Sequence, residues 1–317
     1  MSGDKKIIAV VGATGAQGGG LARAILDDES GPFAVRALTR DPTSDRAREL
    51  AQAGADVVRA DLDDLDSVHR AFEGAWGAFC VTNFWEHLSP EKEIAQARNM
   101  AEAAKRAGLE HVIWSTLEDT RNWMPLDDER MPTLMDKYKV PHFDAKGEAN
   151  AEFTSRAVPT TFLLTSFYWD NLLYFGMEPK RGEDGTLAFV LPMADKPLSG
   201  MAAADIGKCA YGIFKAGEEY IGRTVGIAGE HLTGEQMASA LGEALGETVA
   251  YVAVEPEVYR GFGFPGAEDL GNMFQFKTEF NDYFCGVRNV DESRALNPEL
   301  LSFAAWLGAN KASMPIT

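Results

Sequence analysis

Residues Lys6 to Gly18 read Lys-Ile-Ile-Ala-Val-Val-Gly-Ala-Thr-Gly-Ala-Gln-Gly and carry the clearest structural signal in the chain. Lys6 to Val11 is an apolar run that stops at a glycine, which predicts a strand buried on both faces. Small and apolar residues then recur at helical spacing from Ala16 to Leu26. The segment therefore predicts a strand, a glycine turn and a helix, the opening of a βαβ unit.

The turn has glycines at positions 12, 15 and 18. In this context the first glycine permits a tight turn, the second lets the backbone approach a pyrophosphate, and the third lets helix and strand pack closely. A helix N-terminus also offers unpaired N–H groups to phosphate. We therefore favour a dinucleotide site over a glycine-rich turn that binds nothing.

The same alternation continues downstream. Further strands are predicted at 33–39, 56–60, 76–82, 111–115 and 160–165, and helices between them at 43–53, 67–72, 89–107 and 143–156. This order predicts an α/β fold with a doubly wound, parallel sheet of the Rossmann type. Residues 117–140 are polar and proline-containing without a period, which indicates a surface insertion or a lid-like loop.

The second half is less regular. Strands are predicted at 186–191 and 247–254, and helices at 203–216, 233–245, 256–260 and 297–310. For a chain of 317 residues we expect two parts. Residues 1–160 would form the NAD(P)-binding Rossmann domain, with the insertion at about 117–140. Residues 161–317 would form a smaller α/β lobe for substrate or partner, interleaved with the last Rossmann elements.

Composition narrows the class of protein. The net charge of −18 disfavours binding to nucleic acid or to anionic lipid by bulk charge. No stretch reaches the about 18 apolar residues of a membrane helix. The three cysteines are far apart, which favours reduced thiols and a cytoplasmic location. The histidines lack metal-ligand spacing, so no metal site is predicted.

The residues at the end of the second predicted strand indicate which dinucleotide the protein binds, NAD(H) or NADP(H). A carboxylate that binds the adenosine ribose of NAD is expected about 20 residues after the glycine turn, but Arg40 stands there. A guanidinium can bind a 2′-phosphate through two hydrogen bonds, which favours NADP(H). Asp41 is adjacent and could reach a ribose hydroxyl, so NAD stays an alternative.

Several motifs together resemble the NmrA-like family of atypical short-chain dehydrogenases/reductases. They are Val11–Gly19, Leu38-Thr-Arg40, Asp61-Leu-Asp63, Val81–Glu86, His142–Glu148 and Phe167–Leu172. Gly263–Ala267 and Asn272–Phe274 are similar to the redox-sensor branch of that family. The resemblance covers nearly the whole chain apart from about 121–139.

The resemblance implies a cofactor in the cleft between the Rossmann domain and the small lobe. The residues implied for the pyrophosphate are Gly12, Thr14, Gly15, Gln17 and Gly18. Arg40 would hold the 2′-phosphate, and Asp61 and Leu62 would border the adenine. Thr82, Asn83 and Phe84 would line the nicotinamide ribose, Lys146 would bind the ribose hydroxyls, and Tyr168 and Asn171 would border the nicotinamide.

The catalytic pattern departs from the usual one. Short-chain dehydrogenases use Ser, Tyr and Lys, with Tyr and Lys four residues apart on one helix face. Lys146 and Ser115 match this pattern, but His142 replaces the tyrosine. A histidine can donate a proton near neutral pH. The alternatives are that His142 only fills a pocket, or that Tyr138 is the donor.

Two functions remain. The first is an NAD(P)H-dependent reductase of a small carbonyl or quinone-like substrate, with Lys146, His142 and Ser115 as catalytic residues. The second is a non-catalytic NADP(H) redox sensor that acts through a regulated protein partner. The sequence is compatible with a homodimer.

Overall fold

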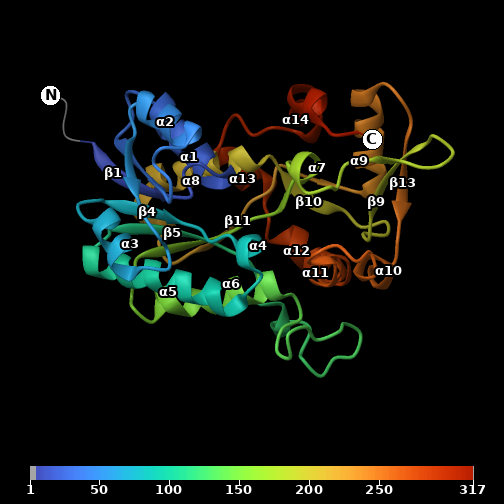
Figure 1. Ribbon diagram of the computed structural model, residues 1–317, viewed down its shortest axis with the longest axis horizontal. Helices are drawn as coiled ribbons and strands as arrows, with labels where there is room; N and C mark the ends of the chain where they lie inside the picture. The colour runs from blue at the N-terminus through green and yellow to red at the C-terminus, as the bar shows by residue number, and fades with distance from the viewer. Residues whose placement is uncertain (1–4, 317) are drawn as a thin grey trace.

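The computed structural model describes residues 5–316, and its centre is a seven-stranded sheet in the order β11-β6-β5-β4-β1-β2-β3 (Figure 1). All its strand pairs are parallel. The strands are β1 (Lys6–Val11), β2 (Phe33–Thr39), β3 (Asp56–Arg59), β4 (Gly77–Cys80), β5 (His111–Thr116), β6 (Thr160–Leu164) and β11 (Thr224–Gly226). The predicted doubly wound α/β fold is confirmed.

Helices cover both faces of the sheet (Figure 1). One face packs against α1 (Ala16–Asp27), α2 (Asp45–Gln52) and α8 (Ala203–Ala216). The other packs against α3 (Leu65–Phe72), α5 (Pro90–Ala107) and α6 (Pro141–Thr154). As predicted, the Ser89 hydroxyl caps α5 by accepting a hydrogen bond from the Lys92 N–H, and Gly108 ends it in a left-handed conformation.

Close backbone contacts at glycines hold α1 on two sides, against β1 and against α8. Gly12 has φ +64°, and a Cβ on Gly18 would lie 2.5 Å from the Gly12 carbonyl oxygen, so the strand and the helix touch backbone to backbone. On the outer side of α1, a Cβ on Gly20 would lie 2.2 Å from the Ala204 carbonyl oxygen. A Cβ on Gly207 would lie 2.0 Å from the Leu21 nitrogen. Helix α8 therefore lies directly against α1 although nearly two hundred residues separate them.

The C-terminal part adds two small sheets, β12-β10-β7 and β13-β9-β8. Their strands are β7 (Phe167–Tyr168), β8 (Lys180–Arg181), β9 (Leu187–Leu191), β10 (Leu198–Met201), β12 (Glu230–Leu232) and β13 (Val249–Ala253). The helices are α7 (Asn171–Tyr174), α9 (Gly234–Leu245), α10 (Pro256–Arg260), α11 (Ala267–Glu279), α12 (Asn281–Gly286), α13 (Val290–Leu296) and α14 (Phe303–Asn310). Helix α13 packs on α8, whereas the other helices, α7 included, lie with the two small sheets (Figure 1).

The core of this part contains a charged side chain. Lys277 of α11 is only 2% exposed, and its ammonium lies 5.2–6.0 Å from four ring centroids, those of Phe143, Phe167, Phe274 and Phe284. Burial, with the nearby Arg288 charge, lowers the pKa of Lys277 to about 7. The desolvation that lowers this pKa also costs folding free energy while the amine is charged.

One prediction from the sequence needs correction. The last helix begins at Phe303 and not at Asn297, because Ser302 caps it by accepting from the Ala305 N–H while Asn297 ends α13. The segment 117–140 is irregular apart from a short 3-10 turn at Thr120–Asn122, and some of its side chains pack into the fold. Met124, Met131 and Val140 are buried, and the Lys139 ammonium donates to the carbonyls of Asp128 and Met131.

Within residues 5–316, every helix is too short or too polar to cross a lipid bilayer.

Candidate functional site

The turn between β1 and α1 presents open backbone to solvent. Gly12, Gly15 and Ala16 are exposed, and no side chain caps the first turn of α1. The free N–H groups and the positive end of the helix dipole are the donor set that a pyrophosphate requires. The close packing at Gly18 brings these amides to the carboxyl edge of the sheet. The turn therefore fits the diphosphate of a dinucleotide.

Gln17 links two other predicted site residues through its side-chain amide. Its amide nitrogen donates to the Tyr168 hydroxyl at 2.5 Å, and its amide oxygen accepts from the Ser115 hydroxyl at 2.8 Å. Burial raises the pKa of the Tyr168 phenol, so it stays protonated at neutral pH. Residues from α1, β5 and β7 thus meet at one point of the edge.

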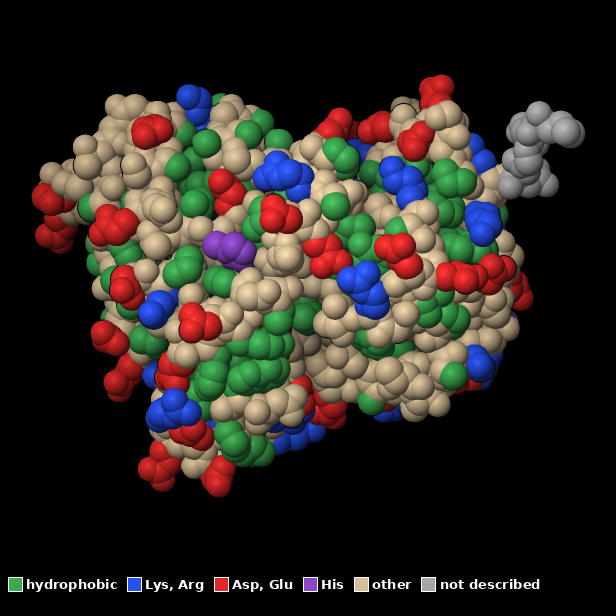
Figure 2. Space-filling view, turned by 180° about the vertical axis from the view of Figure 1, so that it is seen from behind, with side chains coloured by type: hydrophobic (Ala, Val, Ile, Leu, Met, Phe, Trp, Pro, Cys, Tyr) green, Lys and Arg blue, Asp and Glu red, His purple; other side chains and the backbone are tan. Residues whose placement is uncertain are grey.

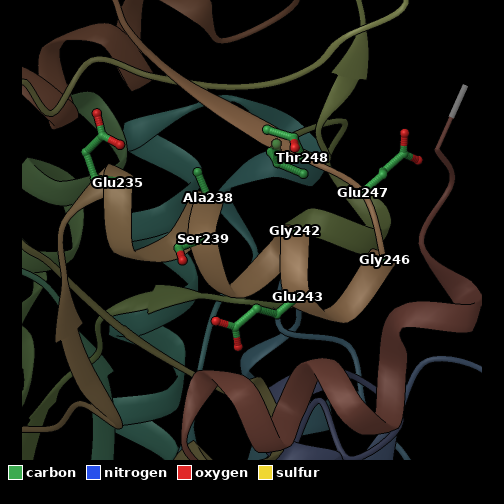
Figure 3. Close-up of a pocket in the computed structure, with 9 residues that line it drawn as sticks. Glu235, Ala238, Ser239, Gly242, Glu243, Gly246, Glu247 and Thr248 are labelled. Carbon is green, nitrogen blue, oxygen red and sulfur yellow. The ribbon is translucent and has the colours of Figure 1, made fainter.

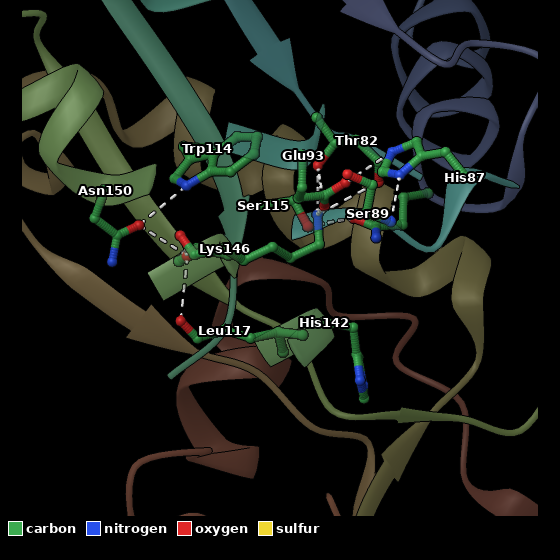
Figure 4. Close-up of polar contacts among 12 residues, drawn as sticks. Thr82, His87, Ser89, Glu93, Trp114, Ser115, Leu117, His142, Lys146 and Asn150 are labelled. Atoms are coloured by element: carbon green, nitrogen blue, oxygen red, sulfur yellow. Dashed lines mark hydrogen bonds and ion pairs between the residues drawn. The ribbon is translucent and has the colours of Figure 1, made fainter. Parts of the chain in front are cut away.

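Lys146 lies in a buried polar cluster (Figure 4). Its ammonium donates to the Thr82 hydroxyl at 2.7 Å and forms an ion pair with Glu93 of α5 at 2.8 Å. Thr82 also donates to Glu93 at 2.5 Å, and His87 lies 3.3 Å from the other carboxylate oxygen. Burial alone raises the pKa of Glu93, but Lys146, the nearby His87 and the hydrogen bond from Thr82 outweigh it, and the pKa falls to about 2.

Glu93 was not among the predicted site residues. Its signal in the sequence is a carboxylate on the inward face of α5, where it is completely buried beside Ala97 and Met100. A charge at a core position indicates a partner charge elsewhere in the fold.

His142 and Ser115 are not brought together with Lys146 in one hydrogen-bonded group. The His142 ring points away from the Lys146 ammonium (Figure 4). Its Nδ1 lies 2.6 Å from a carboxylate oxygen of Asp269, the other oxygen of which accepts from the His142 backbone N–H at 3.2 Å. A carboxylate only accepts, so Nδ1 carries the proton and donates. The His142 Nε2 has no hydrogen-bond partner among residues 5–316.

The His142 ring lies between aromatic groups. Ring centroids of Trp85 and Phe84 are 4.8 and 6.0 Å away. Tyr138, the other proton donor considered, is fully buried with its ring against Arg121 and Lys137. The geometry thus gives His142, and not Tyr138, an orienting carboxylate of the kind that general acid–base histidines have.

Two arginines lie near the end of β2 and the glycine turn, where the adenosine of a dinucleotide is expected. Arg40 is 69% exposed and forms an ion pair with Glu86 of α4 (Phe84–His87). Arg46 of α2 reaches the glycine turn and donates to the Thr14 carbonyl at 3.2 Å. Arg46 was missed in the sequence, since nothing in its spacing shows that α2 turns it toward the turn.

The remaining predicted residues also follow carboxyl ends of strands. Asp61 is exposed, and Leu62 accepts a hydrogen bond from Asn99 through its carbonyl. Asn83 is exposed at the start of α4, whereas Phe84 is buried. Asn171 begins α7 and is half-buried.

A separate groove lies between α9 and β13, lined by residues such as Glu235, Ser239, Glu243 and Thr248 (Figure 3). It contains none of the predicted site residues. No group of His, Cys, Asp or Glu with metal-binding geometry occurs in the described part of the chain. Acidic side chains are spread over the face in Figure 2 with basic ones between them, in keeping with the net charge.

Comparisons with known proteins agree with this architecture. The model of the NmrA-like family matches residues 4–307. The NmrA-like family domain-containing oxidoreductase FrzB of Cladobotryum sp. is 31% identical over 88% of this chain and 86% of its own. A crystal structure of NmrA, described as a negative transcriptional regulator, in complex with NADP has a TM-score of 0.77, 28% identity and coverage of 96% and 95%.

Other solved structures include NmrA with NAD, at a TM-score of 0.78 and 28% identity over 96% of this chain and 95% of that one. The Citrobacter sp. triphenylmethane reductase complexed with NADP(H) has a TM-score of 0.73 over 96% and 99% of the two chains; at 18% identity it supports the fold alone. From the family match over almost its full length and the relatives above, the chain belongs to the NmrA-like family.

Proposed function

We propose that this protein binds NADP(H) at the carboxyl edge of its sheet and reduces a small carbonyl or quinone-like substrate. The observation that carries the proposal is the convergence on that edge of the uncapped α1 N-terminus, the Gln17 network and the buried Lys146 ammonium. These groups supply donors for a diphosphate and for ribose hydroxyls. The NADP and NAD complexes of NmrA support the choice of ligand.

The bound nicotinamide would supply a hydride, two electrons, to the electrophilic carbon of the substrate. Lys146 would donate to ribose hydroxyls and hold the ring in place. His142 would act in its doubly protonated form, with Nδ1–H bonded to Asp269. It would give the Nε2 proton to the substrate oxygen, become the neutral imidazole with Nδ1–H, and take up a new Nε2 proton from solvent. The Ser115 hydroxyl, which donates to the Gln17 amide oxygen without substrate, would turn its one hydrogen to the substrate oxygen while charge develops there.

A redox sensor that regulates a protein partner is the second candidate. It is favoured by the absence of the tyrosine and by the separate partners of Ser115, His142 and Lys146. NmrA itself is described as a negative transcriptional regulator. A sensor requires that cofactor states differ in affinity for the partner. In either role we place the protein in the cytosol, with its three cysteines as free thiols.

Calorimetry with NADPH and NADH tests the cofactor. Arg40→Ala should weaken NADPH binding much more than NADH binding, and equal losses would remove the 2′-phosphate role. Absence of heat with every nicotinamide dinucleotide would overturn both candidates.

Oxidation of NADPH with a panel of ketones, aldehydes and quinones tests the reaction. His142→Gln should lower kcat while cofactor affinity is kept, because only the proton transfer is removed. Tight cofactor binding without turnover across the panel would favour the sensor.

A further inference from the structure

Helix α4 connects the two ends of the candidate cofactor site. Its four residues have contacts in different directions. Phe84 and Trp85 lie against the His142 ring, Glu86 pairs with Arg40, and His87 lies 3.3 Å from Glu93, the partner of Lys146. One short segment therefore contacts the groups proposed for the 2′-phosphate, for the ribose and for proton transfer.

The contact between Arg40 and Glu86 uses the same guanidinium that is proposed for the 2′-phosphate. Both side chains are open to solvent, with 69% and 44% of their areas exposed. A carboxylate and a phosphate are alternative ligands for one guanidinium, and the phosphate carries more charge. Asp61 and Asp63 also lie near Arg40, so an arriving phosphate meets several negative charges there.

We infer that Glu86 is a specificity-determining residue that competes with the 2′-phosphate of NADP(H) for Arg40, so that α4 responds to NADP(H) and not to NAD(H). This inference rests on the proposed binding of NADP(H). NAD(H) has a hydroxyl at this position and leaves the Arg40–Glu86 pair intact. NADP(H) displaces Glu86 from Arg40 and so breaks the ion pair that connects α4 to the end of β2.

Loss of the Glu86 contact can move the rest of α4, because few hydrogen bonds hold the backbone of this helix. Helix α4 has one turn, closed by the Leu88 N–H to the Phe84 carbonyl at 2.7 Å, and Leu88 has a φ of +52°. A non-glycine residue in this left-handed region is strained. When Glu86 loses its contact with Arg40, α4 is therefore free to shift, and the shift moves Trp85, which lies beside His142, and His87, which lies beside Glu93.

The test is calorimetry of the full chain with NADP+ and NAD+, and with 2′,5′-ADP as a probe of the adenosine end alone. Glu86→Gln should raise the ratio of NADP+ to NAD+ affinity by roughly three- to tenfold, since an exposed ion pair and one repulsive charge are removed. Glu91→Gln is the matched control. It removes the same charge at the start of α5, where Glu91 contacts Ser89 and Lys137 instead of Arg40.

Hydrogen exchange gives a second readout. Amides of residues 86–88 should exchange faster with saturating NADP+ than with NAD+, and Glu86→Gln should abolish the difference. An unchanged or lowered ratio of NADP+ to NAD+ affinity in Glu86→Gln would overturn the inference. An equal rise of this ratio in Glu91→Gln would overturn it too, because the effect would then come from the net charge of the protein and not from the Arg40–Glu86 pair. Failure of the wild-type protein to bind any dinucleotide would instead remove the proposed function.

Discussion

Replacement of Lys146 by methionine tests whether its ammonium holds a buried carboxylate as well as a cofactor. The variant keeps the length of the side chain but leaves Glu93, which is fully buried, without its cation. The pKa of Glu93 falls from an ordinary 4.5 to about 2 in the folded protein. That difference corresponds to about 3 kcal/mol of folding free energy at neutral pH.

The direction with pH follows from the lowered pKa. A carboxyl with a depressed pKa stabilises the fold above its unfolded value, and this contribution is lost as the pH falls from 4.5 toward 2. Lys146→Met should lower the free energy of unfolding by about 3 to 5 kcal/mol at pH 7, because it leaves a buried charge without its cation, and by progressively less as the pH falls and Glu93 becomes protonated. The double variant Lys146→Met, Glu93→Gln should regain most of the loss, because no charge is left buried.

Urea denaturation followed by circular dichroism measures these differences. Lys92→Met is the control, because Lys92 is on α5 next to Glu93 and its ion pair with Asp63 is exposed, so its removal should change the free energy of unfolding little. A loss in Lys146→Met no larger than in Lys92→Met would refute the reasoning. The double variant also separates the roles of Lys146, since it should fold but bind NADPH more weakly.

Three further variants test other parts of the structure. Lys277→Met should stabilise the protein by about 1 to 4 kcal/mol at pH 7 in urea denaturation, less than the full desolvation cost because four aromatic rings offset part of it. Because the pKa of Lys277 is depressed from 10.5 to about 7, the stability of the wild-type protein should rise as the pH increases from 7 to 10.5. The extra stability of Lys277→Met over the wild type should shrink over the same range. A Lys277→Met variant less stable than the wild type at pH 7 would contradict this. Arg46→Ala should weaken binding of NADPH and NADH alike, because Arg46 lies over the turn that both share; a loss confined to NADPH would place it at the 2′-phosphate instead. Asp269→Ala should lower kcat and mix the two imidazole tautomers of His142 in ¹⁵N spectra, whereas an unchanged tautomer would exclude a positioning role.

Local signals in the sequence were sufficient for the Rossmann part. The apolar run Lys6–Val11, the glycine turn and the caps at Ser89 and Gly108 act over a few residues, and the structure has each of them in its predicted place. Helix α11 was missed because it is buried on most sides and therefore lacks an amphipathic period.

The polar partners of the site could not be predicted in the same way. Asp269 is 127 residues from His142, and Glu93 is on a different helix from Lys146. Sequence spacing shows which residues share one face of one helix, but not which second helix packs opposite it. The resemblance to the NmrA-like family indicated His142 and Lys146 by position, and the structure supplied the carboxylates that hold them.

The contact of α8 with α1 bears on any attempt to shorten the protein. Truncation after residue 160 would remove α8, β6 and β11 together. It would strip the outer side of α1 at Gly20, where the two backbones touch, and leave β5 as an unpaired sheet edge. We expect such a fragment to aggregate, so the dinucleotide-binding half has to be produced with the chain that follows it.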